Sequence, residues 1–177
     1  ENRDIDLLFI GNLSYYSNIE AIEYLMDTIW PAVLQTNHSL KFCIAGAEPN
    51  KQIEQKIVDK AEILYLKNVE KINELYKRAK IFIAPITKGT GQQNKILEAL
   101  AGGCSVICSH EVQSAFEHEF PSIKSCSTTF NYISTIHQLL SNFDSTISDR
   151  QESQTILKKH YNWTIINQKL ISIIKQQ

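Results

Sequence analysis

The sequence lacks an excess of basic charge and a long apolar run, and each absence excludes a class of protein. Its 177 residues carry 18 Lys and Arg against 19 Asp and Glu, a net charge of −1. Non-specific binding of nucleic acid needs a basic face that displaces counterions. No apolar run reaches the roughly 18 residues of a membrane span, and the polar start at Glu1 has no signal-peptide core. We therefore expect a cytoplasmic protein with no nucleic-acid partner.

The sequence also lacks a paired-cysteine motif. Its four cysteines, Cys43, Cys104, Cys108 and Cys126, form no C-x-x-C pair. Cys104 and Cys108 fall in an expected strand that would hold them about 13 Å apart, too far for a shared metal. The five histidines show no ligand spacing. We expect free buried thiols in a reducing compartment, no metal site and no cofactor.

Short apolar runs alternate with amphipathic stretches along the chain. Residues 18–34 carry apolar side chains at helical spacing, with Asn18 as the expected N-cap. The expected strands are residues 5–10, 40–45, 63–66, 81–84, 105–108 and 123–126. The expected helices are residues 18–34, 51–60, 72–79, 92–101 and 111–119, and two or three more from Phe130 onward, with residues 141–148 as a loop between helices.

The order of these elements predicts an α/β fold: a Rossmann-like parallel sheet of about six strands flanked by helices. The strands are apolar throughout and do not alternate, which is typical of parallel strands buried on both faces. The length predicts a single domain over residues 1–177. Because ligands bind beyond the carboxyl ends of such strands, the site is expected in the loops after Ile10, Leu66, Ala84 and Cys108.

The segment 84–101 (APITKGTGQQNKILEALA) contains the most informative pattern. Its glycines allow the backbone to approach a ligand closely. The helix that follows offers unpaired N–H groups and a partial positive charge, which favour an anion such as phosphate. The predicted anion site consists of Gly89, Thr90, Gly91, Gln92, Gln93 and Asn94.

Lys95 and Glu98 follow in this helix, one turn apart on the same face. A lysine is unfavourable near a helix N-terminus, and a bound anion would explain its position. Two interpretations stay open: a plain Lys95–Glu98 salt bridge, or a lysine that binds phosphate beside a carboxylate that accepts from a ribose. Neither a P-loop nor the dinucleotide fingerprint is present, since Gly11 and Asn12 follow the first strand without G-x-G-x-x-G.

Several short sequence blocks lie at a characteristic spacing between residues 5 and 110. They are residues 9–13 (FIGNL), Tyr16, Asn18, Ala21, Trp30-Pro31, residues 44–46 (IAG) and, most specific, residues 89–103 with the run QNKILEA. These blocks resemble the donor-binding C-terminal half of GT-B glycosyltransferases of the family 4 type, the glycosyl transferases of group 1. The resemblance implies a retaining hexosyltransferase that uses a nucleotide-activated sugar, such as a UDP-sugar, to glycosylate a glycan, lipid or other acceptor.

The resemblance also implies roles for residues around the diphosphate. In the family the diphosphate lies against the glycine-rich loop and helix N-terminus, here residues 89–94, and against the loop after the first strand, here Gly11 and Asn12. Many members carry an Arg and a Lys in that second loop, and this sequence carries neither. Lys95, with Lys88, is therefore expected to stabilise the charge on the leaving phosphate.

The rest of the donor is assigned in the same way. The last glutamate of the motif, Glu98, would hold the ribose, and with Lys95 it forms the expected catalytic pair. The base would rest against Asn68 and Val69. At the position where the family often has an earlier glutamate that contacts the sugar, this sequence has Thr90.

A GT-B enzyme also needs an acceptor-binding N-terminal domain, for which this chain has no room. Because the first residue is not Met, we expect this chain to be the C-terminal half of a longer enzyme. We expect this half to be inactive without its N-terminal half. A peripheral membrane contact through the N-terminal half stays open. Tyr161-Asn162-Trp163 resembles the closing helices of the family; core packing is the alternative for Trp163. Two other functions stay open: a nucleotide- or phosphate-binding module without chemistry, and a GT-B-type sugar-nucleotide epimerase.

Overall fold

The computed structural model describes residues 3–36, 39–49, 51–88 and 91–161. Its strands are β1 (Ile5–Asn12), β2 (Phe42–Ala47), β3 (Ile63–Lys67), β4 (Ala79–Ala84), β5 (Ser105–Ser109) and β6 (Ile123–Cys126). Its helices are α1 (Tyr16–Tyr24), the π-helical turn η1 (Leu25–Ile29), α2 (Trp30–Leu34), α3 (Lys51–Val58), α4 (Ile72–Arg78), α5 (Asn94–Ala101), α6 (His110–Gln113), α7 (Thr129–Ser141), the 3-10 helix η2 (Phe143–Thr146) and α8 (Ile147–His160).

The strands form one sheet in the order β3-β2-β1-β4-β5-β6, and all neighbours are parallel. Gly11 pairs with Gly46 across β1 and β2, and Leu8 pairs with Phe82 across β1 and β4. The predicted Rossmann-like sheet of six parallel strands is thereby confirmed. The chain reverses its direction of winding between β1 and β4, and in open sheets of this kind ligands bind at such a point, beyond the carboxyl ends of the two strands.

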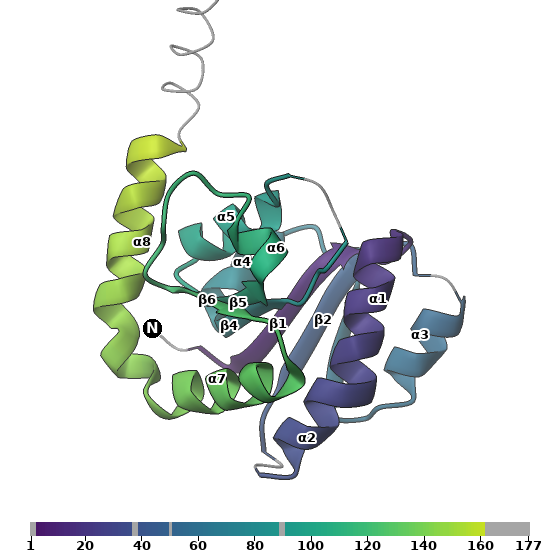
Figure 1. Ribbon diagram of the computed structural model, residues 1–177. Helices are drawn as coiled ribbons and strands as arrows, with labels where there is room; N and C mark the ends of the chain where they lie inside the picture. The colour runs from purple at the N-terminus through teal and green to yellow at the C-terminus, as the bar shows by residue number, and fades with distance from the viewer. Residues whose placement is uncertain (1–2, 37–38, 50, 89–90, 162–177) are drawn as a thin grey trace, which may run out of the picture.

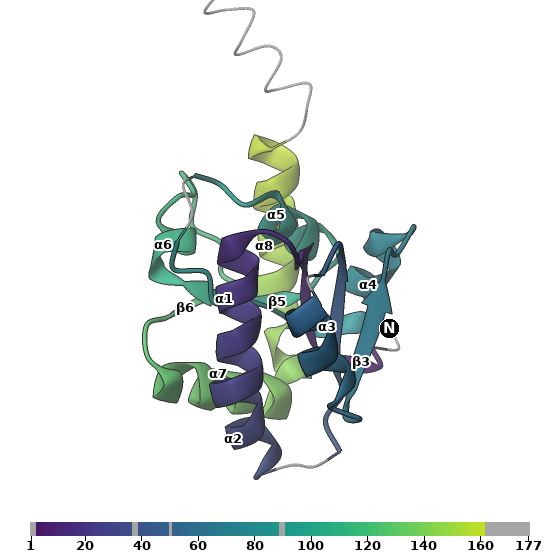
Figure 2. The ribbon, with the colours of Figure 1, turned by 90° about the vertical axis from the view of Figure 1, so that its right-hand side faces the viewer.

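Helices cover both faces of the sheet (Figures 1 and 2). One group consists of α1, η1, α2 and α7, and α7 also packs on β4, β5 and β6. The other group consists of α4, α5 and α8, with α8 packed along α5. Right-handed crossovers on the two sides of the winding reversal place the two groups on opposite faces. Between the layers lie large, fully buried side chains such as Trp30 and Phe42, whose ring centroids are 5.1 Å apart.

The burial of the strands follows the apolar pattern of the sequence. The central strands β1, β2, β4 and β5 are buried along most of their length. The edge strands β3 and β6 are only half-buried, because each has a neighbour on one side only. All four cysteines are buried and free, as expected. Within the described ranges, no group of three or more His, Cys, Asp or Glu side chains could hold a metal ion.

The helix expected over residues 18–34 differs in two ways. It begins at Tyr16, with Tyr15 as its N-cap, so the prediction that Asn18 caps it is wrong. It also contains the π-helical turn η1 directly before Trp30 and Pro31. Proline has no N–H to donate to the preceding turn, and an inserted residue in a π turn relieves the mismatch. Asn18 consequently lies inside α1, where it is buried.

Two further differences lie in the second half of the chain. The helix expected over residues 111–119 is only α6, capped by Ser109, whose side chain accepts from the N–H of Val112. The rings of Phe116 and Phe120 then pack edge to face with their centroids 6.0 Å apart, and Phe120 enters the core from the loop between α6 and β6. The loop expected over residues 141–148 contains η2. Of the helices described, none is both long and apolar enough to cross a bilayer.

Candidate functional site

The N-terminus of α5 lies at the carboxyl end of the sheet, where the loop after β4 passes the turn after β1. No side chain caps α5, and its first turn contains no acidic residue. Its main-chain N–H groups are therefore available to an anion. Gly91 has φ +84°, and no heavy atom lies within 4 Å of where its Cβ would be, so a ligand can approach the backbone here. Gln92 and Asn94 are exposed and Gln93 is half-buried, whereas Gly89 and Thr90 lie outside the described residues.

Lys95 points from α5 toward β1 and α1. Its Nζ donates to Oδ1 of Asn18 over 2.7 Å and lies 5.0 Å from the ring centroid of the buried Phe9. Burial lowers the pKa of Lys95 to about 8, so the side chain still carries its charge at neutral pH. Among the described residues no carboxylate forms an ion pair with it, and this excludes the plain Lys95–Glu98 salt bridge as the explanation of the motif. Lys95 is instead a cation held by a neutral acceptor beside an uncapped helix N-terminus.

The turn after β1 is held together by its own side chains. The amide of Asn12 donates to Glu48 over 3.1 Å, and its Oδ1 accepts from the N–H of Ser14 over 2.8 Å. Gly11 is required here because a Cβ atom would lie 2.8 Å from Nδ2 of Asn18. The turn therefore presents mainly backbone to a ligand. Lys88, the second predicted cation, forms an exposed ion pair of 2.7 Å with Glu20.

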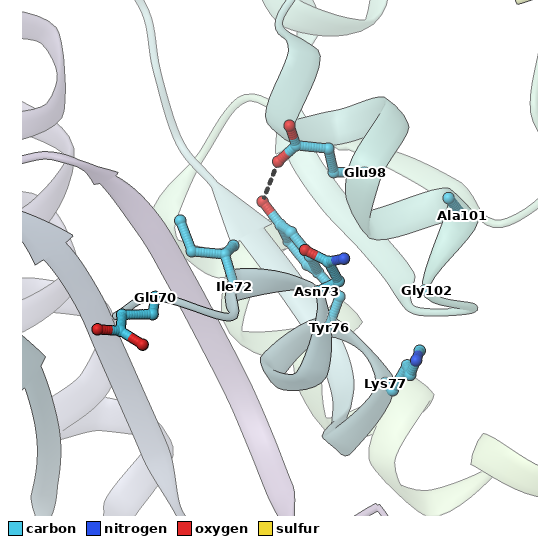
Figure 3. A pocket seen from close by; sticks show the side chains of 8 residues that line it. All are labelled: Glu70, Ile72, Asn73, Tyr76, Lys77, Glu98, Ala101 and Gly102. Atoms are coloured by element: carbon cyan, nitrogen blue, oxygen red, sulfur yellow. Dashed lines mark hydrogen bonds between the residues drawn. The ribbon is translucent and has the colours of Figure 1, made fainter. Parts of the chain in front are cut away.

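Glu98 faces a pocket of about 540 Å³ between α4 and α5. Figure 3 shows the residues that line it: Glu70, Ile72, Asn73, Tyr76, Lys77, Glu98, Ala101 and Gly102. The buried Tyr76 donates from its hydroxyl to Oε2 of Glu98 over 3.0 Å. Burial and the neighbouring carboxylate raise the pKa of Tyr76, so it remains a donor. A volume of this size suits a small ligand, and Glu98 is one of the polar groups that line it.

Asn68 and Val69, the residues expected at the base, form the turn between β3 and α4. Asn68 has φ 53°, a left-handed conformation that Asn tolerates better than most residues, and its N–H donates to the carbonyl of Gly46 over 3.1 Å. The side chain of Val69 packs against the core. Glu70, the next residue, lines the pocket that Glu98 faces. The structure thus brings the loop after β3 and α5 to one pocket.

We expect Tyr76→Phe to loosen Glu98 without disturbing the core. The ring stays packed on Phe82, 5.5 Å away between centroids, and only the hydroxyl is lost. The free energy of unfolding should fall by about 0.5–1.5 kcal/mol, the value of one hydrogen bond. Chemical denaturation monitored by circular dichroism measures this. A loss above about 3 kcal/mol would instead indicate a cavity or a repacked core.

The comparisons with known proteins bear on this geometry. The sequence model of the family described as glycosyl transferases group 1 matches residues 4–141 of this chain. The chain belongs to this family. An uncharacterized 44.6 kDa protein in the cps region of Klebsiella pneumoniae is 28% identical over 111 residues, which are 58% of this chain and 28% of that protein.

Solved structures share the fold of this group 1 glycosyltransferase chain at low identity. TarM of S. aureus, in a complex that contains UDP, has 15% identity and a TM-score of 0.77 over 97% of this chain and 36% of its own. HepE of Anabaena, in complex with UDP, has 13% identity and a TM-score of 0.76 over 99% of this chain and 50% of its own. The C-terminal domain of LpcC from Francisella tularensis has 18% identity and a TM-score of 0.66, over 92% of this chain and 94% of its own. The fold is that of the C-terminal half of a GT-B glycosyltransferase.

The structure of this glycosyltransferase chain adds two polar contacts that the sequence does not reveal. Asn18 reaches Lys95 from another helix, 77 positions away, and Tyr76 reaches Glu98 across 22 positions. A polar residue near a helix start suggests a cap, and a tyrosine at helical spacing suggests core packing. The clue that the sequence does offer is spacing: Asn18 lies three and four positions before Ala21 and Ile22, on the apolar face of the helix.

Proposed function

We propose that this chain is the donor-binding half of a retaining hexosyltransferase that transfers a sugar from a nucleoside diphosphate-sugar, with UDP as the carrier, to a glycan, lipid or other acceptor. The observation that carries the proposal is the pairing of two sites on one helix. The N-terminus of α5 is uncapped and flanked by Lys95, and Glu98 one turn later faces the pocket beside the loop after β3. A nucleoside diphosphate has the same order of groups: diphosphate, ribose, base. The UDP in the TarM and HepE structures supports this carrier.

Each group of the donor has a proposed contact. The diphosphate lies at residues 89–94 and against the backbone of Gly11 and Asn12. As the bond from the anomeric carbon to the phosphate breaks, negative charge grows on the leaving diphosphate. The N–H groups of α5, its dipole and Lys95 stabilise that charge. In the proposed reaction these groups supply the positive charge, and no metal ion or other cofactor takes part.

The ribose and base complete the donor site. Glu98 keeps free lone pairs beyond the bond from Tyr76, because an ionised carboxylate offers about four acceptor positions. Two ribose hydroxyls can therefore donate to it at once. The base rests against Asn68 and Val69, at the turn that leads to Glu70 and the pocket. At position 90 this chain has Thr where the family often has a glutamate that contacts the sugar. No carboxylate therefore contacts the sugar from that position.

The proposed enzyme needs a second half. The chain spans 28% of its curated relative and 36% and 50% of the TarM and HepE chains. We propose that an N-terminal acceptor domain in cis supplies the rest of the active site, in a cytoplasmic enzyme that can contact a membrane through that domain.

We expect the 177-residue chain to bind UDP or GDP and to transfer no sugar, because the donor groups are present and the acceptor groups belong to the other half. Isothermal titration with UDP, GDP and their sugars measures binding, and transfer to an acceptor is followed by the nucleotide released. Turnover onto an acceptor by this chain alone would contradict the proposed division between halves. Absence of any nucleotide binding would contradict the donor site itself.

A further inference from the structure

Asn18 is a buried polar residue in an unusual position. It lies inside α1, only 6% exposed, although Asn is a poor helix former. Its Nδ2 donates to the carbonyl of Asn12 over 2.7 Å, and its Oδ1 accepts from Nζ of Lys95 over 2.7 Å. Only the amide nitrogen can donate to a carbonyl and only the amide oxygen can accept from an ammonium. Both bonds therefore agree on one orientation of the side chain.

We propose that Asn18 is a positioning residue for the donor diphosphate, which holds Lys95 beside the turn after β1 without neutralising its charge. The inference rests on the proposed donor site and extends it to α1. One amide links three parts of that site: the Asn12 carbonyl in the turn after β1, the helix α1, and Lys95 at the start of α5. Gly11 leaves the space for this amide, since a Cβ there would lie 2.8 Å from Nδ2 and 2.9 Å from Cγ.

A neutral acceptor matters because of what surrounds Lys95. Two acidic residues of α1 and α5 have other partners: Glu20 pairs with Lys88, and Glu98 accepts from Tyr76. The ring of Phe9 lies beneath the ammonium, 5.0 Å away. In this setting an aspartate at position 18 would accept from the lysine but cancel its charge, and it would lose the donor to the Asn12 carbonyl. An asparagine fixes the lysine and leaves the full charge for an incoming anion.

The test is a double-mutant cycle between Asn18→Ala and Lys95→Met, with UDP affinity of the 177-residue chain as the readout. We expect Asn18→Ala to weaken UDP binding about five- to tenfold in the wild-type background and to have no further effect in the Lys95→Met background. Asn142→Ala is the matched control. It removes an amide that donates to the Gln138 carbonyl over 2.9 Å at the end of α7, away from α5, and should leave the affinity unchanged.

A second variant separates positioning from packing. Asn18→Asp keeps the shape of the side chain but places a carboxylate beside Lys95. An acid next to an ammonium favours the charged form, so the loss of UDP affinity at alkaline pH should move to higher pH, while the affinity at pH 7 falls. An unmoved pH profile would show that residue 18 does not act on UDP binding through Lys95, and the positioning role would then be wrong.

The outcomes distinguish this inference from the proposed function. If Lys95→Met weakens binding but Asn18→Ala does not, or Asn18→Ala weakens it equally in both backgrounds, the positioning role is wrong and the donor site stands. If the wild-type chain binds neither UDP nor GDP, both are wrong. If Lys95→Met leaves UDP binding intact, Lys95 does not contact the diphosphate and the positioning role of Asn18 is wrong, while the donor site stands. Should Asn18→Ala fail to fold, the pH profile of Asn18→Asp decides alone.

Discussion

Lys95→Met should weaken UDP binding by about 1.5–3 kcal/mol, roughly 10- to 150-fold, the value of a charge-assisted hydrogen bond. The reason is the position of the ammonium, which lies at the uncapped start of α5 with no carboxylate partner among the described residues. Methionine is chosen because it keeps an unbranched side chain over the ring of Phe9. Isothermal titration at fixed ionic strength measures the loss.

The pH dependence adds an independent check on Lys95. Burial lowers its pKa to about 8 from the ordinary value of 10.5. As pH rises through 8 the free protein loses this charge, so the UDP affinity of the wild type should fall, while that of Lys95→Met should stay flat. Folding stability changes in the opposite direction. Between pH 8 and 10.5 the unfolded chain binds more protons at this lysine, so the stability of the wild type relative to that of Lys95→Met should rise with pH.

The control for Lys95→Met is Lys56→Met. This substitution also removes one positive charge. In the wild type, Lys56 pairs with Asp27 over 2.5 Å on the surface and lies outside the proposed donor contacts. It should leave UDP binding within about twofold, since exposed ion pairs contribute little. Intact binding in Lys95→Met together with a marked fall in melting temperature would make Lys95 a structural residue.

The sheet could be predicted from the sequence because burial on both faces leaves a local mark. Each central strand is an apolar run bounded by glycine, proline or a polar turn, such as residues 5–10 before Gly11 and β4 before Pro85, and this pattern does not depend on distant residues. The glycine-rich segment and the start of α5 could be predicted for the same reason. Loop and helix here follow from neighbouring residues alone.

What the sequence could not reveal depends on contacts between distant segments. Local sequence rules predict that Asn18 caps a helix. In the structure its amide contacts Lys95, because α1 and α5 both begin at the carboxyl edge of the sheet. The short α6 has a similar cause. Residues after Gln113 could continue a helix locally, yet the chain instead places Phe120 in the core. The contact from Tyr76 to Glu98 likewise requires α4 and α5 to lie side by side.

Glu98→Gln should weaken UDP or GDP binding by about 1–3 kcal/mol and leave the binding of inorganic pyrophosphate nearly unchanged. Glu98 faces the pocket between α4 and α5, one turn beyond the proposed phosphate site. The carboxylate accepts from Tyr76 and still has acceptor positions for two ribose hydroxyls, whereas an amide offers a single oxygen. Pyrophosphate has the charge of the diphosphate and no ribose, so the two ligands separate a ribose contact from a general electrostatic effect.

Two outcomes would contradict the ribose role of Glu98. Equal losses for UDP and pyrophosphate would show that the substitution acts on the phosphate site, and no loss for either would show that Glu98 does not touch the donor. Tyr76→Phe is the internal control, because it frees the carboxylate from its partner while its charge and acceptor positions remain. If Glu98 holds the ribose, Tyr76→Phe should weaken UDP binding by less than Glu98→Gln does. It should leave pyrophosphate binding unchanged as well.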